Sequence, residues 1–105
     1  MKWQDLAASV SIYPTASKDW NRIQLFFKAC AAKEAELIAA GNVKDLEAFN
    51  KEGIAHGMAW LYRLGQVTAK AWAYIGRDPF KGERETARAF AKKWSLSDEF
   101  RKAMG

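Results

Sequence analysis

Apolar side chains recur every three or four residues along most of this chain, which is the spacing of one face of an α-helix. One apolar stripe covers residues 18–40 and stops at Gly41. A second stripe keeps a constant phase over residues 43–76, after Asn42, a good N-cap residue with Asp45 at the capping-box position. The pattern therefore predicts two long antiparallel helices, over 18–40 and 43–76, joined by a short turn.

Shorter helical patterns precede and follow this pair. Trp3, Leu6 and Val10 begin a short pattern that ends before Pro14, a residue that interrupts helices. A fourth helix is expected over about 83–94, and Ser97 is placed to cap a last short one. Sustained alternation of apolar and polar residues, the mark of a strand, is missing from the sequence. The 105 residues thus predict a single all-α domain over residues 1–105, a compact helical bundle.

The second long helix is too long for a round domain of this size. Residues 43–76 would span roughly 50 Å as one helix, whereas a compact domain of this length is only about 35 Å across. We therefore expect the helix to bend or overhang near Gly53, Gly57 and Gly65, or to reach into a second subunit. Because Gly53 and Gly57 lie within the apolar stripe, we interpret them as the site of a close helix crossing.

Charge is distributed unevenly along the chain. The 17 Lys and Arg residues exceed the 12 Asp and Glu residues by five. Residues 1–52 are neutral overall, so the whole excess lies in residues 53–105. This asymmetry is a modest indication of an anionic partner.

Basic residues in the second half also recur at helical spacing. His56 and three cations follow one another at intervals of seven, and three more cations follow at intervals of four. Two such ridges could contact phosphate oxygens, and Tyr62 could add a stacking surface. The residues of this candidate surface are Arg63, Lys70, Arg77, Arg84, Arg88, Lys92 and Tyr62. An ordinary solvated face, with Arg84 paired to Glu83 or Glu85, explains the same pattern.

The segment 90–97 resembles a helix-turn-helix in outline. Ser95 stands where such a turn usually has glycine, and the second helix would begin with Asp98 and Glu99, two carboxylates facing phosphates. That helix would also have only about two turns. A helical corner that closes the core is therefore the favoured interpretation.

Few residues could act as a catalytic acid, a nucleophile or a metal ligand, and these few are scattered along the sequence. Glu34 falls near the centre of an apolar stripe, where it needs a partner, and His56 is a candidate for a buried polar pair with it. His56 and Glu52 are too few to hold a metal, and Cys30, the single cysteine, lies on an apolar stripe. We therefore expect no enzyme, no metal, no cofactor and no small-molecule substrate.

The chain contains more aromatic residues than the contact between its two long helices requires. Five Trp, three Tyr and six Phe are present, and most project inward. The apolar face of the second long helix is about 200° wide, broader than one bundle contact requires. Met58, Trp72 and Tyr74 lie at its borders and are the candidate interface residues. Full coverage of this face by the short helices is an equally good interpretation.

The expected compartment and partners follow from the cysteine content, the polarity of the uncharged run and the basic surface. One free cysteine suits the cytoplasm, and the longest uncharged run, residues 6–17, is too polar for a signal peptide or membrane span. The hypothesis is a non-enzymatic binding module that contacts a protein, or a second copy of itself, through a basic surface bordered by aromatic residues. The alternative is a nucleic-acid-binding protein that contacts phosphates.

Overall fold

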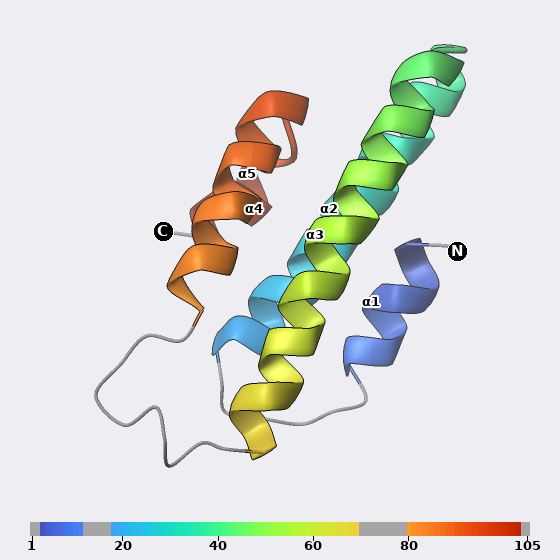
Figure 1. Cartoon of the computed structure of the whole chain (residues 1–105). Coiled ribbons are helices and arrows are strands. Elements are labelled where there is room, and N and C mark those ends of the chain that lie inside the picture. Colours follow the sequence, from blue (N-terminus) through green and yellow to red (C-terminus); the bar gives the residue numbers. More distant parts are fainter. Residues whose placement is uncertain (1–2, 12–17, 70–79, 104–105) are drawn as a thin grey trace.

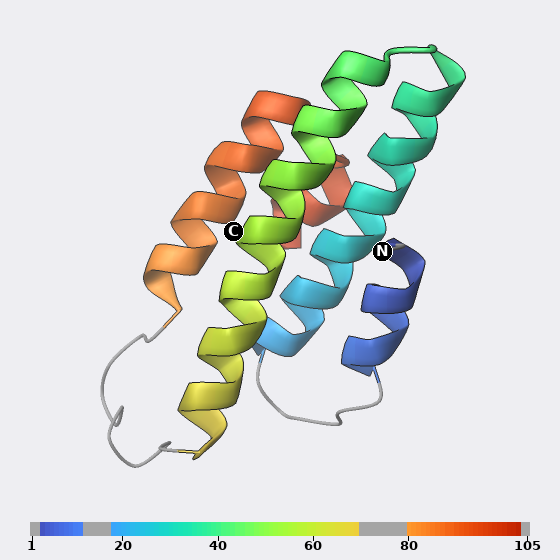
Figure 2. The same cartoon turned by 45° about the vertical axis from the view of Figure 1, so that its right-hand side comes forward.

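The fold is an all-α bundle, as the hydrophobic pattern predicts. The computed structural model describes residues 3–11, 18–69 and 80–103, and these residues contain helices but no strand (Figures 1 and 2). The body measures 47 × 24 × 21 Å. The helices are α1 (Trp3–Ser11), α2 (Lys18–Ala39), α3 (Val43–Ala69), α4 (Lys81–Trp94) and α5 (Asp98–Ala103).

The antiparallel hairpin of α2 and α3 forms the long axis of the molecule. Gly41 has a φ of 69°, a left-handed conformation that glycine adopts without steric cost and that ends α2. Asn42 then caps α3: its Oδ1 accepts a hydrogen bond of 3.3 Å from the Asp45 backbone N–H, and its Nδ2 donates one of 2.7 Å to the Asp45 carboxylate. The predicted turn and cap are both confirmed.

The long helix α3 runs uninterrupted through Gly53, Gly57 and Gly65. Its 27 residues span about 40 Å and lie along the 47 Å dimension of the body, so an elongated shape accommodates the helix. The bend expected at the glycines is not seen over the described length of the helix (Figure 1). The predicted continuation over residues 70–76 lies outside the described residues.

The tip of the hairpin extends past α1 (Figure 2). Ile38, which the apolar stripe predicts to be inward, is 60% exposed there, and Val43 is 63% exposed. The prediction for Ile38 is wrong because α1, only nine residues and about 13 Å long, does not reach this end of the hairpin.

The core is a cluster of aromatic rings around Phe26 of α2. The Phe26 ring centroid lies 6.2 Å from that of Trp60 in α3 and 5.6 Å from that of Phe90 in α4. It also lies 6.4 Å from Trp3 in α1 and 5.5 Å from Phe100 in α5. Rings from the four other helices therefore meet at this one side chain.

Two glycines of α3 make room for these rings. A Cβ built on Gly57 would come 2.5 Å from Cε1 of Phe27, and one on Gly53 would come 3.0 Å from both Phe90 and Trp3. Distances this short are sterically forbidden or very tight, so any larger residue would push α3 away from its neighbours. The two glycines therefore make room for aromatic rings: the atoms nearest their Cβ positions are all side-chain atoms, so the close approach of two helix backbones is not what these glycines provide.

A sharp corner joins α4 to α5. Ser95 has a left-handed φ of 53°, and the Leu96 N–H donates back to the Ala91 carbonyl at 2.9 Å, a pattern that closes the end of α4. The corner buries Leu96 and Phe100 in the core, while Ser97 accepts the Phe100 N–H at 3.4 Å. These contacts agree with the helical-corner interpretation of this segment.

Gly57→Ala is expected to destabilise the fold by about 1–2 kcal/mol, because overpacking against Phe27 exceeds the gain in helix propensity. Gly65→Ala is the matched control: it lies in the same helix with nothing within 4 Å of its Cβ position, so it should stabilise by about 0.5–1 kcal/mol. Urea denaturation of both variants at low micromolar concentration measures the difference. Equal effects of the two substitutions would contradict the close packing of the Phe27 ring against Gly57.

Candidate functional site

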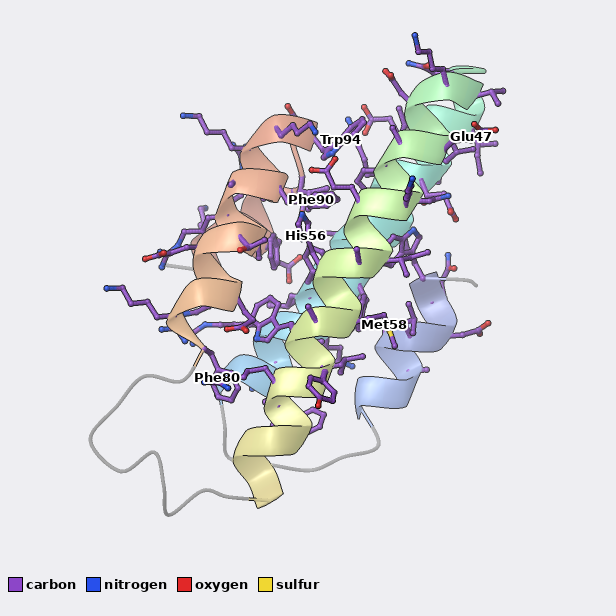
Figure 3. The ribbon with its side chains drawn as sticks, in the orientation of Figure 1. Glu47, His56, Met58, Phe80, Phe90 and Trp94 are labelled. Atoms are coloured by element: carbon purple, nitrogen blue, oxygen red, sulfur yellow. The ribbon has the colours of Figure 1, made fainter. Side chains whose placement is uncertain are left out.

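The outward side of α3 is left uncovered by the other helices. In Figure 1, α2 lies behind α3, while α4 lies on the left of α3 and α1 on the right. Met58 is 43% exposed and lies at the flank of α3 toward α1 (Figure 3), and Tyr62 is 71% exposed. Spacings of three and four residues place several exposed residues on one helical face with them. The outer face of α3 consists of Lys44, Ala48, Lys51, Ala55, Met58, Ala59 and Tyr62.

Half of this outer face is free of charge. From Ala55 through Tyr62 it carries only alanine, methionine and tyrosine, and its two lysines, Lys44 and Lys51, lie toward the hairpin tip. Exposed helix faces are normally charged, whereas tyrosine and methionine are enriched at protein interfaces. The arrangement is typical of a small contact surface. The structure thus places the predicted interface residue Met58 on the surface; Trp72 and Tyr74 lie outside the described residues.

The predicted basic ridges are distributed over two different sides. Arg63 is half-buried and lies two helical turns after His56, on the flank of α3 that faces α4. Arg88 and Lys92 are exposed on the side of α4 turned away from Thr86, a residue that borders a pocket against α3. Arg84, half-buried, is one turn before Arg88 on that same side. Of the remaining ridge residues, Lys70 and Arg77 fall outside the described part of the chain.

A carboxylate on α3 links α3 to α4. Glu52 accepts a hydrogen bond of 2.8 Å from Lys93 Nζ, and His56 Nε2 lies 3.9 Å from the other Glu52 oxygen. The Lys93 hydrogen bond is the main reason that the pKa of Glu52 lies below its ordinary value, and the nearby His56 acts in the same direction. The sequence alone does not indicate this ion pair, because its members are 41 residues apart and share no helical spacing.

His56 itself lies in the seam between α3 and α4. Figure 3 shows it beside Phe90 and Trp94, and its ring meets that of Phe90 edge to face at 5.4 Å. A shallow pocket of about 240 Å³ opens next to it. The pocket is lined by His56, Ala59, Gly82, Glu83 and Thr86. Its polar lining is His56, Glu83 and Thr86, of which His56 and Glu83 are half-buried.

The structure does not bring Glu34 and His56 together as a buried pair. Phe27 of α2 packs at Gly57 of α3, so Glu34 lies seven residues, about 10 Å, further along the antiparallel hairpin. Glu34 is half-buried beside Cys30. Burial raises the pKa of the Cys30 thiol far above its ordinary value, and the Glu34 carboxylate adds to this effect, so the thiol stays protonated.

The described residues include no group of three or more His, Cys, Asp or Glu side chains arranged to hold a metal ion. Among these residues, no helix combines the length and apolar character needed to cross a membrane. Comparison of the chain with protein-family models, with curated proteins and with solved structures finds no match. The two candidate sites are the outer face of α3, for its exposed Met58 and Tyr62, and the basic side of α4, for its exposed Arg88 and Lys92.

The Glu52–Lys93 contact predicts a pH dependence of stability. Because the folded-state pKa of Glu52 is depressed, its contribution is fully present above about pH 4.5, the ordinary value, and is lost as the pH falls through the lower folded value. Glu52→Gln should lower the free energy of unfolding by about 0.5 kcal/mol at pH 7 and by little at pH 3, as measured by urea denaturation. Exposed Glu47→Gln is the control and should change neither value appreciably. An equal loss at both pH values would contradict an electrostatic role for Glu52.

Proposed function

We propose that this chain is a non-enzymatic helical binding module that contacts a protein partner through the outer face of α3. The observation that carries the proposal is the exposure of Met58 and Tyr62 on a face that is uncharged from Ala55 to Tyr62. Apolar and aromatic side chains of this kind supply most of the energy of small protein interfaces when they become desolvated. Alanines beside them allow a partner backbone to approach closely.

A binding role also fits the placement of the chemical groups. Cys30 is buried and protonated, and Glu52 is engaged with Lys93, so neither is a suitable nucleophile or general base. We assign the module to the cytoplasm because the free thiol suits a reducing compartment.

Site-specific photo-crosslinking in cells tests the proposed interface. A benzophenone amino acid at position 62 is expected to give a discrete protein adduct on illumination, because this position is the most exposed large apolar residue of the face. Ala89, exposed on α4, provides the control position and should give no such adduct. Adding Ala59→Glu should abolish the adduct by placing a charge in the interface. Adducts that are equal at both positions, or unaffected by Ala59→Glu, would exclude the outer face of α3 as the surface that contacts the partner.

A second candidate function is supported by the basic side of α4. Arg84, Arg88 and Lys92 follow one another at spacings of four along this side, and Lys92 and Arg88 are exposed. Such a ridge could contact successive phosphate oxygens of DNA or RNA. In this second candidate function, Tyr62 and Arg63 of α3 do not join the α4 residues in contacting nucleic acid, because they lie on other sides of the bundle.

Titration against random-sequence duplex DNA, single-stranded DNA and RNA tests this candidate. We expect micromolar binding at low salt. The logarithm of the binding constant should fall linearly with the logarithm of the salt concentration, with a slope of nearly one unit per phosphate contacted. Arg88→Glu with Lys92→Glu should weaken binding at least tenfold, while Lys44→Glu with Lys51→Glu, exposed lysines of α3, should not. No binding at low salt would eliminate nucleic acid as the partner.

A further inference from the structure

We propose that the basic side of α4 contacts the phosphate backbone of a double-stranded nucleic acid without reading its base sequence. This inference rests on the second candidate function and specifies its ligand. Lys81, Arg88 and Lys92 are exposed and lie within about 40° of one another around the helix. From Lys81 to Lys92 this row of cations is about 17 Å long. A row of outward cations matches the regularly spaced phosphates of a nucleic acid backbone.

The packing of α4 against α3 prevents α4 from lying within a DNA groove. The major groove is about 12 Å wide and an α-helix with its side chains measures about 10–12 Å, so a recognition helix needs both of its flanks free. One flank of α4 is covered by α3, where Lys93 donates its 2.8 Å hydrogen bond to Glu52 and Thr86 borders the pocket beside His56. The side chain of Phe90 is buried in the core. The outward side alone therefore reaches a ligand, and it meets the backbone instead of the base edges.

The residues of α4 favour a duplex over a single strand. Proteins that bind single strands stack the bases on exposed aromatic side chains. Among the described residues of α4 the aromatic side chains are not exposed: Phe90 is buried, and Trp94, half-buried, packs on Phe49 of α3. A duplex carries one negative charge per about 1.7 Å of its axis, about twice the density along one of its strands. Cations without a stacking surface therefore bind the duplex more strongly.

The same side of α4 is unsuited to an anionic lipid surface. Helices that lie on membranes insert an apolar face between the lipid headgroups. The apolar residues Ala87, Phe90 and Ala91 of α4 are buried in the core. The exposed large apolar side chains among the described residues belong to α2 and α3. This distribution favours a nucleic acid as the anionic ligand.

One carboxylate lies within the row of cations. Glu85 is exposed and lies about 20° from Lys92 around the helix, between Lys81 and Arg88 along it. Its negative charge repels phosphates and competes for the neighbouring cations. Glu85→Gln should therefore tighten binding about threefold at low salt, because it removes this repulsion.

Fluorescence anisotropy with labelled duplexes of about 20 base pairs tests the proposal. DNA duplexes of A·T pairs only, of G·C pairs only and of mixed sequence, and an RNA duplex of the mixed sequence, should bind within about threefold of one another. A single strand of the same length should bind about fivefold more weakly or less. With about three phosphates contacted, the logarithm of the binding constant should fall with the logarithm of the salt concentration with a slope of about three.

Single substitutions assign this slope to the row of cations. Lys81→Gln and Lys92→Gln should each lower the slope by about one unit, because each removes one phosphate contact. Lys44→Gln, at an exposed lysine near the hairpin tip, is the matched control and should leave the slope unchanged. Circular dichroism checks that each variant keeps its helix content.

The outcomes separate this inference from the function on which it rests. A preference of about tenfold or more for one duplex, or tighter binding to the single strand, would overturn the backbone contact while leaving nucleic acid as the partner. Vesicles of phosphatidylserine and phosphatidylcholine that bind as tightly as the duplexes would also overturn it, in favour of a lipid surface. No binding to any nucleic acid at low salt would eliminate the second candidate function and this inference together.

Discussion

Contact between Phe26 and rings from every other helix is the constraint on which this fold depends. Phe26 lies midway along α2, and rings from α1, α3, α4 and α5 all pack against it. Aromatic side chains bury large areas and prefer edge or offset contacts, so a single cluster can orient several helices at once. Each of the three shorter helices supplies one ring to this cluster, Trp3 from α1, Phe90 from α4 and Phe100 from α5.

The close approach of α3 follows from the same cluster. Gly57 admits the Phe27 ring and Gly53 admits Phe90 and Trp3, so α3 presses its glycine side into the core. The indole of Trp3 also donates a 3.0 Å hydrogen bond to Asn50, which ties α1 to α3. With the inner side filled and α1 and α4 at the flanks, the opposite side of α3 remains on the surface. The outer face of α3 is thus a geometric consequence of how the rings pack.

Two surfaces of different chemistry result from this arrangement. The outer face of α3 offers Met58 and Tyr62 on a stretch that is uncharged from Ala55 to Tyr62, whereas Arg88 and Lys92 extend from α4 on another side. Desolvation of apolar groups would drive association at the first, and neutralisation of phosphate at the second. Salt should therefore affect binding at the two surfaces in different ways.

The sequence by itself determined the features that depend on neighbouring residues. Helix spacing, the Asn42 cap and the turn at Gly41 could be predicted because they involve residues within one or two turns of each other. The tertiary structure alone decided which helices cover which faces. It exposed Ile38, separated Glu34 from His56, and paired Glu52 with Lys93 across 41 residues. Such outcomes depend on the lengths and relative positions of whole helices, which the periodicity of a single helix does not encode.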